Sequence, residues 1–573
     1  MDRGYRYHAD LIQRHIELVP GYAAIRDSLL PGLDIGEETL RAILGAAAEF
    51  AERRLVPVNR AGDLQGCRFQ AGRVLTPDCY KQAWQELTSA GWNSVDQPTE
   101  FGGQGLPSFV NTACRELFDR ACMAIGMLTG PTRAGTQLLL EFADPALQQE
   151  WIPQLVAGKW SLTICISEAD AGSDVGRVRS QAVPDADGRW GVTGEKMWTS
   201  FGDNDLVERI GHLLLARTPG APAGTAGLSL FLVPNKVRGQ SGEWVGNGVS
   251  PRRIEEKLGL HGSPTCAMGF EGAKGHLLGR LHRGLPQMFV MIQSMRLMVA
   301  TEGVGISFGA EQAALGYAAE RRQGGNPSQP PVAINTHVDI QRQLLSMAAR
   351  VEVLRGMLYE LAVRIDVERQ NVVVDERHAR ITQWLLPIAK ASCPEAAFEV
   401  PSAAIQVLGG AGYTREWPCG QWLRDARMMS IAEGSTGIQA LDLLHRRLWR
   451  DGGETLFAFV ETATNEIGSA SSEVAGPARR VIERLHRVGR RMLGWRESPR
   501  EAETGAVAFL QLALLAATAW IAVRLATQVD GDRIGRRLAA AGRYWLSDID
   551  ARSAFHEQEA LAGAARLAEF QQV

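Results

Sequence analysis

The sequence predicts a mainly α-helical protein with one β insert, and three observations support this fold class. In the first part of the chain, apolar residues such as Leu40, Ile43, Leu44 and Ala47 recur with the 3.6-residue period of an amphipathic helix. From about 160 to 280, short β-prone runs alternate with turn sequences rich in Pro, Asp and Gly. Long amphipathic patterns then return and continue to the C-terminus, which predicts further helices.

The length of the chain predicts several domains. At 573 residues, it is too long for one hydrophobic core. The changes in pattern predict an N-terminal helical domain over 1–160, a middle β domain over 161–280, a helical-bundle domain over 281–450 and a helical C-terminal extension over 451–573.

Composition limits the classes of partner and cofactor. The formal net charge of −3 gives no electrostatic reason to expect nucleic acid or an anionic membrane as a partner. The eight cysteines form no CxxC pair and no zinc-like spacing with histidine, so we expect no metal site. Such scattered cysteines are typical of a reducing compartment, and the N-terminus lacks the apolar core of a secretory signal. We therefore expect a cytoplasmic protein.

One apolar stretch allows two interpretations. Residues 506–523 are almost wholly apolar, and their number reaches the threshold for a membrane span. The stretch is rich in alanine, contains Gln511 and Thr518, and has no second stretch like it beside it. We therefore expect a buried helix of a helical domain and no integral membrane segment.

The most informative residue is Glu433, which opens the run Glu-Gly-Ser-Thr-Gly-Ile-Gln at 433–439. A carboxylate before a glycine-rich turn can act as a general base with little crowding from Gly434. Alone, a glutamate at a helix edge is more often a capping or salt-bridge residue. The choice between these interpretations depends on the rest of the chain.

Three further blocks precede this run in order. They are Cys-Ile-Ser-Glu-Ala-Asp-Ala-Gly-Ser-Asp at 165–174, Glu-Lys-Met-Trp-Thr-Ser at 195–200 and Gln-Val-Leu-Gly-Gly-Ala-Gly-Tyr at 406–413. Together, the four blocks resemble the acyl-CoA dehydrogenase family of flavoproteins over about residues 37–450. The resemblance implies an N-terminal helical domain, a middle β-barrel or sandwich, a C-terminal four-helix bundle and, here, a helical extension.

The extension and the run Lys-Leu-Gly-Leu-His-Gly-Ser-Pro at 257–264 narrow the resemblance. They are similar to the branch of the family that includes methylthiopropionyl-CoA dehydrogenases and broad-range fatty acyl-CoA dehydrogenases.

The resemblance implies FAD as the cofactor, with one set of contacts in the β insert. Ser167 matches a hydroxyl that bonds the flavin pyrimidine edge, and Ile166 and Ser167 offer backbone N–H groups. Trp198 matches a ring that packs on the isoalloxazine, and Ser200 matches a position near flavin N5. Gly172 and Ser173 let the main chain approach a pyrophosphate. Without the resemblance, 165–174 is an ordinary turn and Trp198 an ordinary core residue.

A second set of implied contacts lies in the helical bundle. Gln406, Gly409 and Gly410 match residues that hold the adenosine diphosphate of FAD across a subunit interface. Arg321 matches an arginine that reaches the pyrophosphate of a neighbouring subunit, although a solvated charge at a helix end is the simpler interpretation. The resemblance therefore implies a homodimer or a larger homo-oligomer. It also assigns the cofactor-binding residues Ser435 and Gly437.

The implied reaction is α,β-dehydrogenation of an acyl-CoA thioester to a 2-enoyl-CoA. In the family, a flavin ribityl hydroxyl and the backbone N–H of the catalytic glutamate, here Glu433, hold the developing enolate oxygen. Glu433 removes the α-proton while the β-hydrogen leaves as hydride to flavin N5. The resemblance implies that an electron-transfer flavoprotein accepts the electrons.

Departures from the family pattern concern the substrate. Ala432 stands where many relatives have an aromatic residue, Ser435 replaces the usual Thr, and Phe201 replaces Asn or Ala. A specialised or bulky acyl group is therefore credible. We also consider five residues for contact with the substrate, which are Ser173, His261, Arg296, Ala432 and Gly434. For Arg296 a salt bridge is equally plausible, and for His261 a structural role is the more common one.

Three alternatives remain at this point. The same fold could serve a flavin oxidase or monooxygenase, or it could act on an acyl group bound to a carrier protein. A basic stripe at 480–491 could receive such an acidic carrier, although a solvated face is the simpler explanation. A non-catalytic flavin- or nucleic-acid-binding relative is disfavoured, because Glu433 is retained and basic and acidic residues balance over 451–573.

Overall fold

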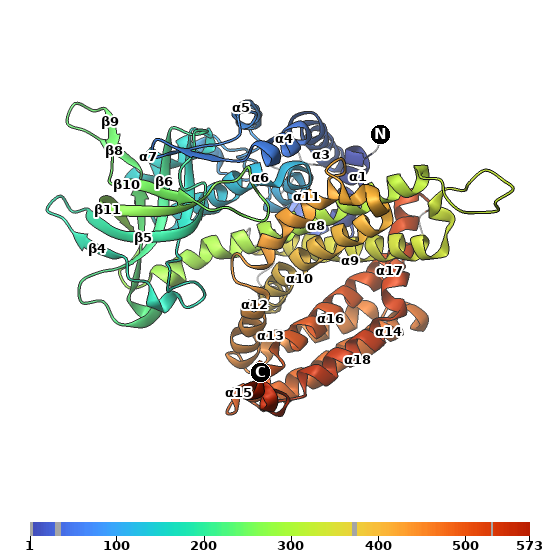
Figure 1. Cartoon of the computed structure of the whole chain (residues 1–573). Helices are drawn as coiled ribbons and strands as arrows, with labels where there is room; N and C mark the ends of the chain where they lie inside the picture. Colours follow the sequence, from blue (N-terminus) through green and yellow to red (C-terminus); the bar gives the residue numbers. More distant parts are fainter. Residues whose placement is uncertain (1–3, 29–35, 370–374, 529–530) are drawn as a thin grey trace. The chain divides into compact units, whose positions relative to one another are not determined.

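The computed structural model describes residues 4–28, 36–369, 375–528 and 531–573 (Figure 1). The chain forms two compact units, and each is described by itself. One unit comprises Met1–Ala48 together with Val299–Val573, and the other comprises Glu49–Met298. We call them the discontinuous unit and the contiguous unit. The four predicted domains divide the chain more finely, and their boundaries remain predictions.

The contiguous unit begins with helices. They are η2 (Ala51–Leu55), α4 (Val56–Gln65), α5 (Tyr80–Ser89), η3 (Thr99–Phe101), α6 (Ser108–Phe142), α7 (Pro145–Val156) and the first part of α8 (Gly284–Glu320). A short hairpin of β1 (Arg68–Gln70) and β2 (Arg73–Leu75) interrupts them. The sequence pattern did not predict this hairpin, because three-residue strands are too short to show a period.

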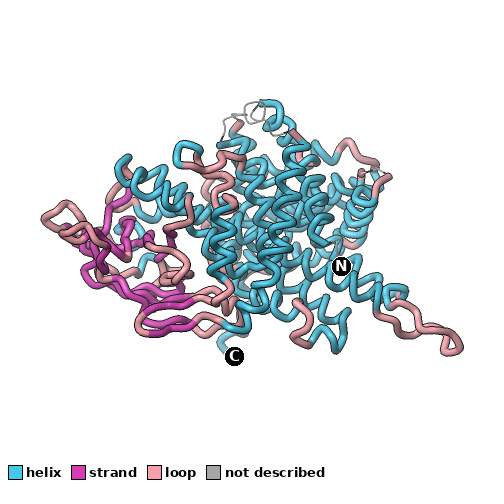
Figure 2. The backbone as a smooth tube through the Cα atoms, turned by 90° about the horizontal axis from the view of Figure 1, so that it is seen from above, coloured by secondary structure: helices cyan, strands magenta, loops and turns pink. Residues whose placement is uncertain are grey.

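A seven-stranded sheet follows the helices in the same unit. Its strands are β3 (Trp160–Cys165), β4 (Gln181–Pro184), β5 (Trp190–Ser200), β6 (Arg209–Arg217), β7 (Leu228–Pro234), β10 (Val249–Ile254) and β11 (Thr265–Leu278). The order is β10-β11-β5-β4-β6-β3, and β7 pairs with both β11 and β6, so the sheet curls on itself. Figure 2 shows these strands in magenta. The predicted β insert is therefore confirmed.

The interior of this sheet is apolar. Leu214, Phe231 and Phe270 are fully buried in one cluster with alanine, valine and methionine side chains from the neighbouring strands. Their burial provides most of the energy that holds a curled sheet closed. A separate hairpin is formed by β8 (Lys236–Arg238) and β9 (Trp244–Gly246).

The discontinuous unit is helical. Its helices are α1 (Gly4–Glu17), α2 (Pro20–Ser28), most of α3 (Glu37–Phe50), the rest of α8, α9 (Val338–Arg369), α10 (Glu376–Leu408), α11 (Cys419–Arg427), α12 (Thr436–Leu444), α13 (Glu454–Ile467), α14 (Ser472–Leu493), α15 (Pro499–Thr504), α16 (Ala506–Ala526), α17 (Arg533–Ser547) and α18 (Ile549–Ala560). Helix α9 packs against α1, α2, α10, α16 and α17. The predicted extension therefore packs on the bundle that precedes it.

Helix α16 is the centre of the extension. It contacts α12, α14, α17 and α18, and most of its side chains are buried. Among the described residues, α8 and α16 are the two helices that are long and apolar enough to cross a membrane by length and composition. Core helices of globular proteins pass the same test, and the burial of most side chains of α16 is typical of such a helix.

Buried ion pairs attach the extension to α9. Arg537 of α17 donates to Glu352 of α9 over 2.7 Å and to Glu311 of α8 over 2.9 and 3.1 Å. Arg524 of α16 donates to Glu360 of α9 over 2.7 Å. Burial alone would raise the pKa of both Glu352 and Glu360, but the neighbouring guanidinium groups outweigh it and lower both pKa values.

Candidate active site

Glu433 lies in a tight turn between the 3-10 turn η8 (Met428–Ser430) and α12. Its φ is +55°, and the φ of Gly434 is +94°, so two consecutive residues are left-handed. A non-glycine residue is rarely found in this conformation, which is strained and is concentrated at functional sites. The turn thus gives the Glu433 side chain a direction that an ordinary helical or extended backbone would not give it.

Gly434 is required by its surroundings as well as by its φ. A Cβ at this position would lie 2.7 Å from Nε2 of Gln439, closer than real Cβ atoms approach other atoms. The expectation that Gly434 leaves the neighbouring glutamate uncrowded is therefore consistent with the geometry. Ala432 and Ser435 lie in the same turn and are half-buried, and Gly437 is exposed in the first turn of α12.

A separate pocket of about 390 Å³ occurs in the discontinuous unit. Arg321, Gly409 and Gly410, three residues predicted to hold adenosine diphosphate, line it together with Tyr317 and Gln323. Gly409 and Gly410 have no atom within 4 Å of the place where a Cβ would stand. A phosphate group can therefore approach the backbone, and the Arg321 guanidinium supplies a cation at the same pocket.

The pocket fits part of a dinucleotide in chemistry and in size. Its donors are an arginine and open glycine backbone, and its walls include the aliphatic side chains of Ile334, Val407 and Leu408. Gln406 lies one turn before the glycines, at the exposed end of α10. The residues present thus fit the adenosine diphosphate portion of FAD.

The contiguous unit holds the other predicted cofactor residues. Ile166 and Ser167 follow β3 directly, and Gly172 and Ser173 are exposed in the loop beyond. Gly172 has open space where a Cβ would stand. The backbone of this loop is therefore open to a phosphate at Gly172, and its contact with FAD remains a prediction.

A buried ion pair supports the start of this loop, and the sequence analysis missed it. The Lys196 ammonium donates to the carbonyl of Ile166 over 3.0 Å and to Glu168 over 2.7 Å. Burial would raise the pKa of Glu168, but Lys196, Ser180 and the Arg179 amide together lower it. Burial lowers the pKa of Lys196, and Glu168 opposes this. Lys196 lies inside the quoted Glu-Lys-Met-Trp-Thr-Ser block, but nothing in that block marks the lysine as buried.

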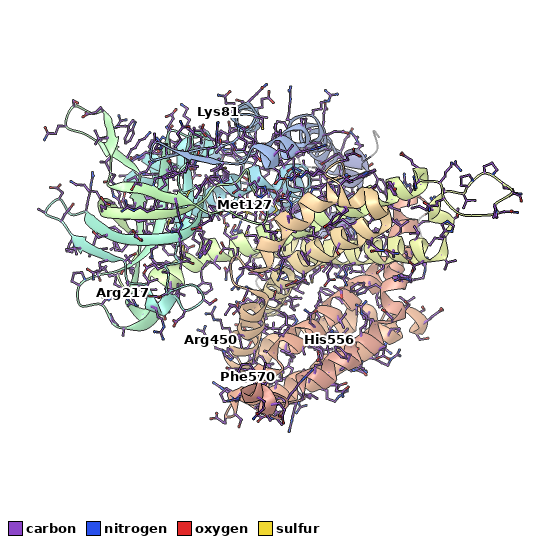
Figure 3. The ribbon with its side chains drawn as sticks, in the orientation of Figure 1. Lys81, Met127, Arg217, Arg450, His556 and Phe570 are labelled. Atoms are coloured by element: carbon purple, nitrogen blue, oxygen red, sulfur yellow. The ribbon has the colours of Figure 1, made fainter. Side chains whose placement is uncertain are left out.

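Arg217 organises the far side of the same loop (Figure 3). It donates to the carbonyl oxygens of Val178, Pro222, Gly176 and Gly224 over 2.5 to 3.0 Å. One guanidinium thereby joins the segment around η4 (Val175–Arg177) to the segment around η5 (Gly224–Gly227). The loop after Ser173 is therefore fixed in place.

Trp198 occupies a β-bulge. The register between β5 and β11 shifts between Cys266 and Met268, so two residues of β5 face one residue of β11. Trp198 has φ +63°, and its side chain is 58% exposed. Bulges redirect side chains, and this one presents an indole away from the core. An exposed indole on a rigid strand suits a platform for a planar ring, and Ser200 lies two residues further along β5.

Two of the five residues considered for substrate contact, His261 and Arg296, lie away from Glu433 in the sequence and have surroundings of their own. His261 lies 2.8 Å from Asp63 of α4 through Nδ1 and 3.0 Å from the Lys257 carbonyl through Nε2. Both ring nitrogens are thus engaged, which favours a structural role. Arg296 is buried in the contiguous unit, whereas Glu433 belongs to the discontinuous unit. Its proposed role beside Glu433 remains a prediction.

Comparison with known families gives three matches in chain order. The N-terminal, middle and C-terminal domain models of acyl-CoA dehydrogenases match residues 37–159, 163–273 and 282–448. The chain is 36% identical to 3-methylmercaptopropionyl-CoA dehydrogenase of Ruegeria pomeroyi, over 85% of each chain. It is 35% identical to the broad-specificity linear acyl-CoA dehydrogenase FadE5 of Mycobacterium tuberculosis, over 74% of this chain and 72% of the relative.

A solved structure supports the fold beyond these three domains. The acyl-CoA dehydrogenase of Bacillus anthracis complexed with FAD superposes with a TM-score of 0.75 at 19% identity, covering 92% of this chain and 89% of the other. The matches define a flavin-dependent oxidoreductase that acts on a CH–CH bond. The chain belongs to the acyl-CoA dehydrogenase family, and the resemblance inferred from the four blocks is confirmed.

Proposed function

We propose that this enzyme desaturates an acyl-CoA thioester between its α and β carbons, with Glu433 as the base that removes the α-proton. The observation that carries the assignment is the strained turn, in which Glu433 has φ +55° immediately before a glycine whose φ is +94°. A base held in this way loses little conformational entropy when it reacts. FAD, when bound, accepts the hydrogen and the electron pair that leave the β-carbon.

The residues of the enzyme have separate tasks in this proposal. Arg321, Gly409 and Gly410 bind the adenosine diphosphate portion of FAD, and Gln406 lies beside them. Ile166, Ser167 and Trp198 bind the flavin ring, with Ser200 near its reactive edge. Gly172 and Ser173 approach the pyrophosphate, and Ser435 and Gly437 contact the cofactor beyond the turn. The backbone N–H of Glu433 stabilises the enolate oxygen while its carboxylate takes the proton.

We propose that the substrate is an acyl-CoA with a specialised or bulky acyl group. The relative from Ruegeria pomeroyi is named for 3-methylmercaptopropionyl-CoA, and the mycobacterial relative for broad specificity toward linear acyl-CoAs. Ala432 supports this proposal, because a small side chain before the base leaves room beside the thioester. We further propose an electron-transfer flavoprotein as electron acceptor, a homodimer or larger assembly, and a cytoplasmic location.

An anaerobic titration tests the proposed reaction. The purified holoenzyme is mixed with a panel of saturated acyl-CoAs, and the flavin absorbance is followed. Bleaching is expected with at least one acyl-CoA, and Glu433→Gln should slow it by about 10²- to 10⁴-fold, as expected for loss of a general base. Glu416→Gln, at an exposed glutamate outside the turn, is the matched control and should bleach normally.

The same titration can contradict the proposal. A protein that contains FAD but is bleached by no acyl-CoA would rule out acyl-CoA dehydrogenation. Normal bleaching of Glu433→Gln would rule out Glu433 as the base.

A further inference from the structure

A lysine of α10 reaches the turn that carries Glu433. The Lys390 ammonium donates to the carbonyl oxygen of Gly434 over 2.5 Å and to that of Met429 over 3.1 Å. The two carbonyls lie on either side of Glu433 in the sequence. One cation therefore connects the beginning and the end of the turn.

The position of this cation is costly. Lys390 has no exposed surface, and a buried ammonium loses its hydration. It is also the only lysine after Lys274. In that part of the sequence every other permanently charged cation is an arginine. A lysine ammonium is compact and can direct its three donors to carbonyls that a planar guanidinium could not reach together. A buried ammonium at this position indicates that Lys390 has a role in holding the turn.

Gln439 binds the same turn from the other end. Its Nε2 donates to the carbonyl of Glu433 over 3.2 Å and to that of Gly434 over 3.1 Å. Gln439 is itself fully buried in the first turns of α12. Three carbonyls of the turn, those of Met429, Glu433 and Gly434, thus receive side-chain donors from two helices.

These donors offset the strain of the turn. A left-handed conformation is unfavourable for a non-glycine residue such as Glu433 unless the surroundings fix it. The carbonyls that Lys390 and Gln439 bind belong to the peptide groups on the C-terminal side of Glu433 and Gly434, and they set the ψ angles of these residues. The direction of the Glu433 side chain follows from this backbone.

We propose that Lys390 and Gln439 are positioning residues that hold Glu433 in its left-handed conformation and thereby direct its carboxylate at the α-proton. Neither residue touches the reacting atoms. The inference rests on the proposed function of Glu433. It adds the residues that hold the base in the required orientation.

Exchange of the α-hydrogen tests this inference separately from the overall reaction. A saturated acyl-CoA is incubated with the holoenzyme in deuterated water, and deuterium at the α-carbon is measured by NMR. Lys390→Met should lower the exchange rate by about 100-fold, as a base displaced by about 1 Å would. FAD content and the acyl-CoA concentration needed for half-saturation should stay within about twofold of wild type.

A double mutant distinguishes positioning from general damage. Adding Lys390→Met to Glu433→Gln should cause no further loss of exchange, because the base through which Lys390 acts is already absent. A further loss of tenfold or more, or unchanged exchange in Lys390→Met alone, would overturn the proposal. Wild-type enzyme without exchange would instead refute the proposed function of Glu433.

A second measurement requires no bound cofactor. Amide hydrogen exchange by mass spectrometry, on protein freed of FAD, should be faster over 428–439 in Lys390→Met and unchanged in peptides from α14. Gln439→Met is the second variant if Lys390→Met does not fold, and it should give the same local change with a smaller kinetic effect. Equal protection of 428–439 in wild type and variants would contradict the inference.

Discussion

Gly434 shows how strictly the catalytic turn restricts its residues. Replacing it with alanine places a Cβ 2.7 Å from Nε2 of Gln439 and forces a side chain into φ +94°. We expect Gly434→Ala to destabilise the protein by about 1–3 kcal/mol. We also expect it to lower the turnover number more than tenfold, because Gln439 is displaced from the Glu433 carbonyl. Thermal unfolding and steady-state kinetics measure the two effects.

A glycine elsewhere in the same unit is the matched control. Gly420 in α11 has open space around its Cβ position and no left-handed φ. Gly420→Ala should leave turnover unchanged and stability within about 1 kcal/mol of wild type, on the stabilising side. Equal losses in both variants would show that the Gly434 effect is not local.

At the scale of residues, the sequence makes candidate catalytic and cofactor-binding residues easier to recognise than the residues that hold them in place. Glu433, Trp198 and Arg321 stand out because their local motifs are contiguous. Lys196 and Lys390 do not, because their partners Glu168 and Gly434 lie 28 and 44 positions away. A lysine shows no sequence sign of being buried until the strands or helices around it are placed.

At the scale of elements, two strands of the sheet carry an acid-sensitive core. His212 of β6 is fully buried and lies 2.8 Å from the Thr163 hydroxyl of β3. Burial lowers the pKa of His212 to about 3. The folded protein therefore keeps this histidine neutral, while the unfolded chain takes up a proton below pH 6.5. His212 thus costs stability progressively as the pH falls from 6.5 toward 3.

Removing the histidine should flatten this dependence. Between pH 7 and 5, His212→Asn should lose about 2 kcal/mol less stability than wild type, whatever its absolute stability. Denaturant unfolding at the two pH values measures the difference, followed through a probe in the β domain. An identical pH dependence in both proteins would mean that folding does not lower the pKa of His212.

Whether the sequence predicts a helix or strand depends on the length of its sequence pattern. Helix α16 and the strands of the middle sheet were expected because each has a long or repeated pattern. The hairpin of β1 and β2 and the bulge at Trp198 were not, because their signals extend over two or three residues. The bulge depends on pairing between β5 and β11, which are far apart in the sequence.

At the scale of the whole molecule, the extension is held by charges as well as by apolar packing. Arg537→Met should leave Glu352 and Glu311 without their shared guanidinium partner. Breaking a buried pair in this way costs about 3–5 kcal/mol. We expect a lower thermal midpoint, while Arg536→Met, at an exposed arginine one position earlier, should change stability by less than about 0.5 kcal/mol. Equal midpoints would show that packing alone holds α17.

The same scale disfavours the basic stripe as a docking surface for a carrier protein. Arg480 and Arg484 donate to Asp550 over 2.7 Å, and Arg484 and Arg487 donate to Glu557 over 2.6 to 2.9 Å. The acidic partners lie on α18, so the charge is used within the chain. The sequence analysis could not pair the two helices, since the residues that form these ion pairs lie 66 to 73 positions apart.

Because one unit is discontinuous in the sequence, the two units can complete their folding at different times during synthesis. The contiguous unit can complete its contacts once Met298 has left the exit tunnel, because all its strands and helices are then available. The N-terminal helix α1 must wait much longer. His15 meets Glu352 only after 337 further residues, and Glu352 meets Arg537 after another 185. Helix α1 is therefore synthesised before the contiguous unit although it belongs to the unit that is completed last, and nascent chains that stall before α17 would lack the guanidinium that Glu311 and Glu352 share.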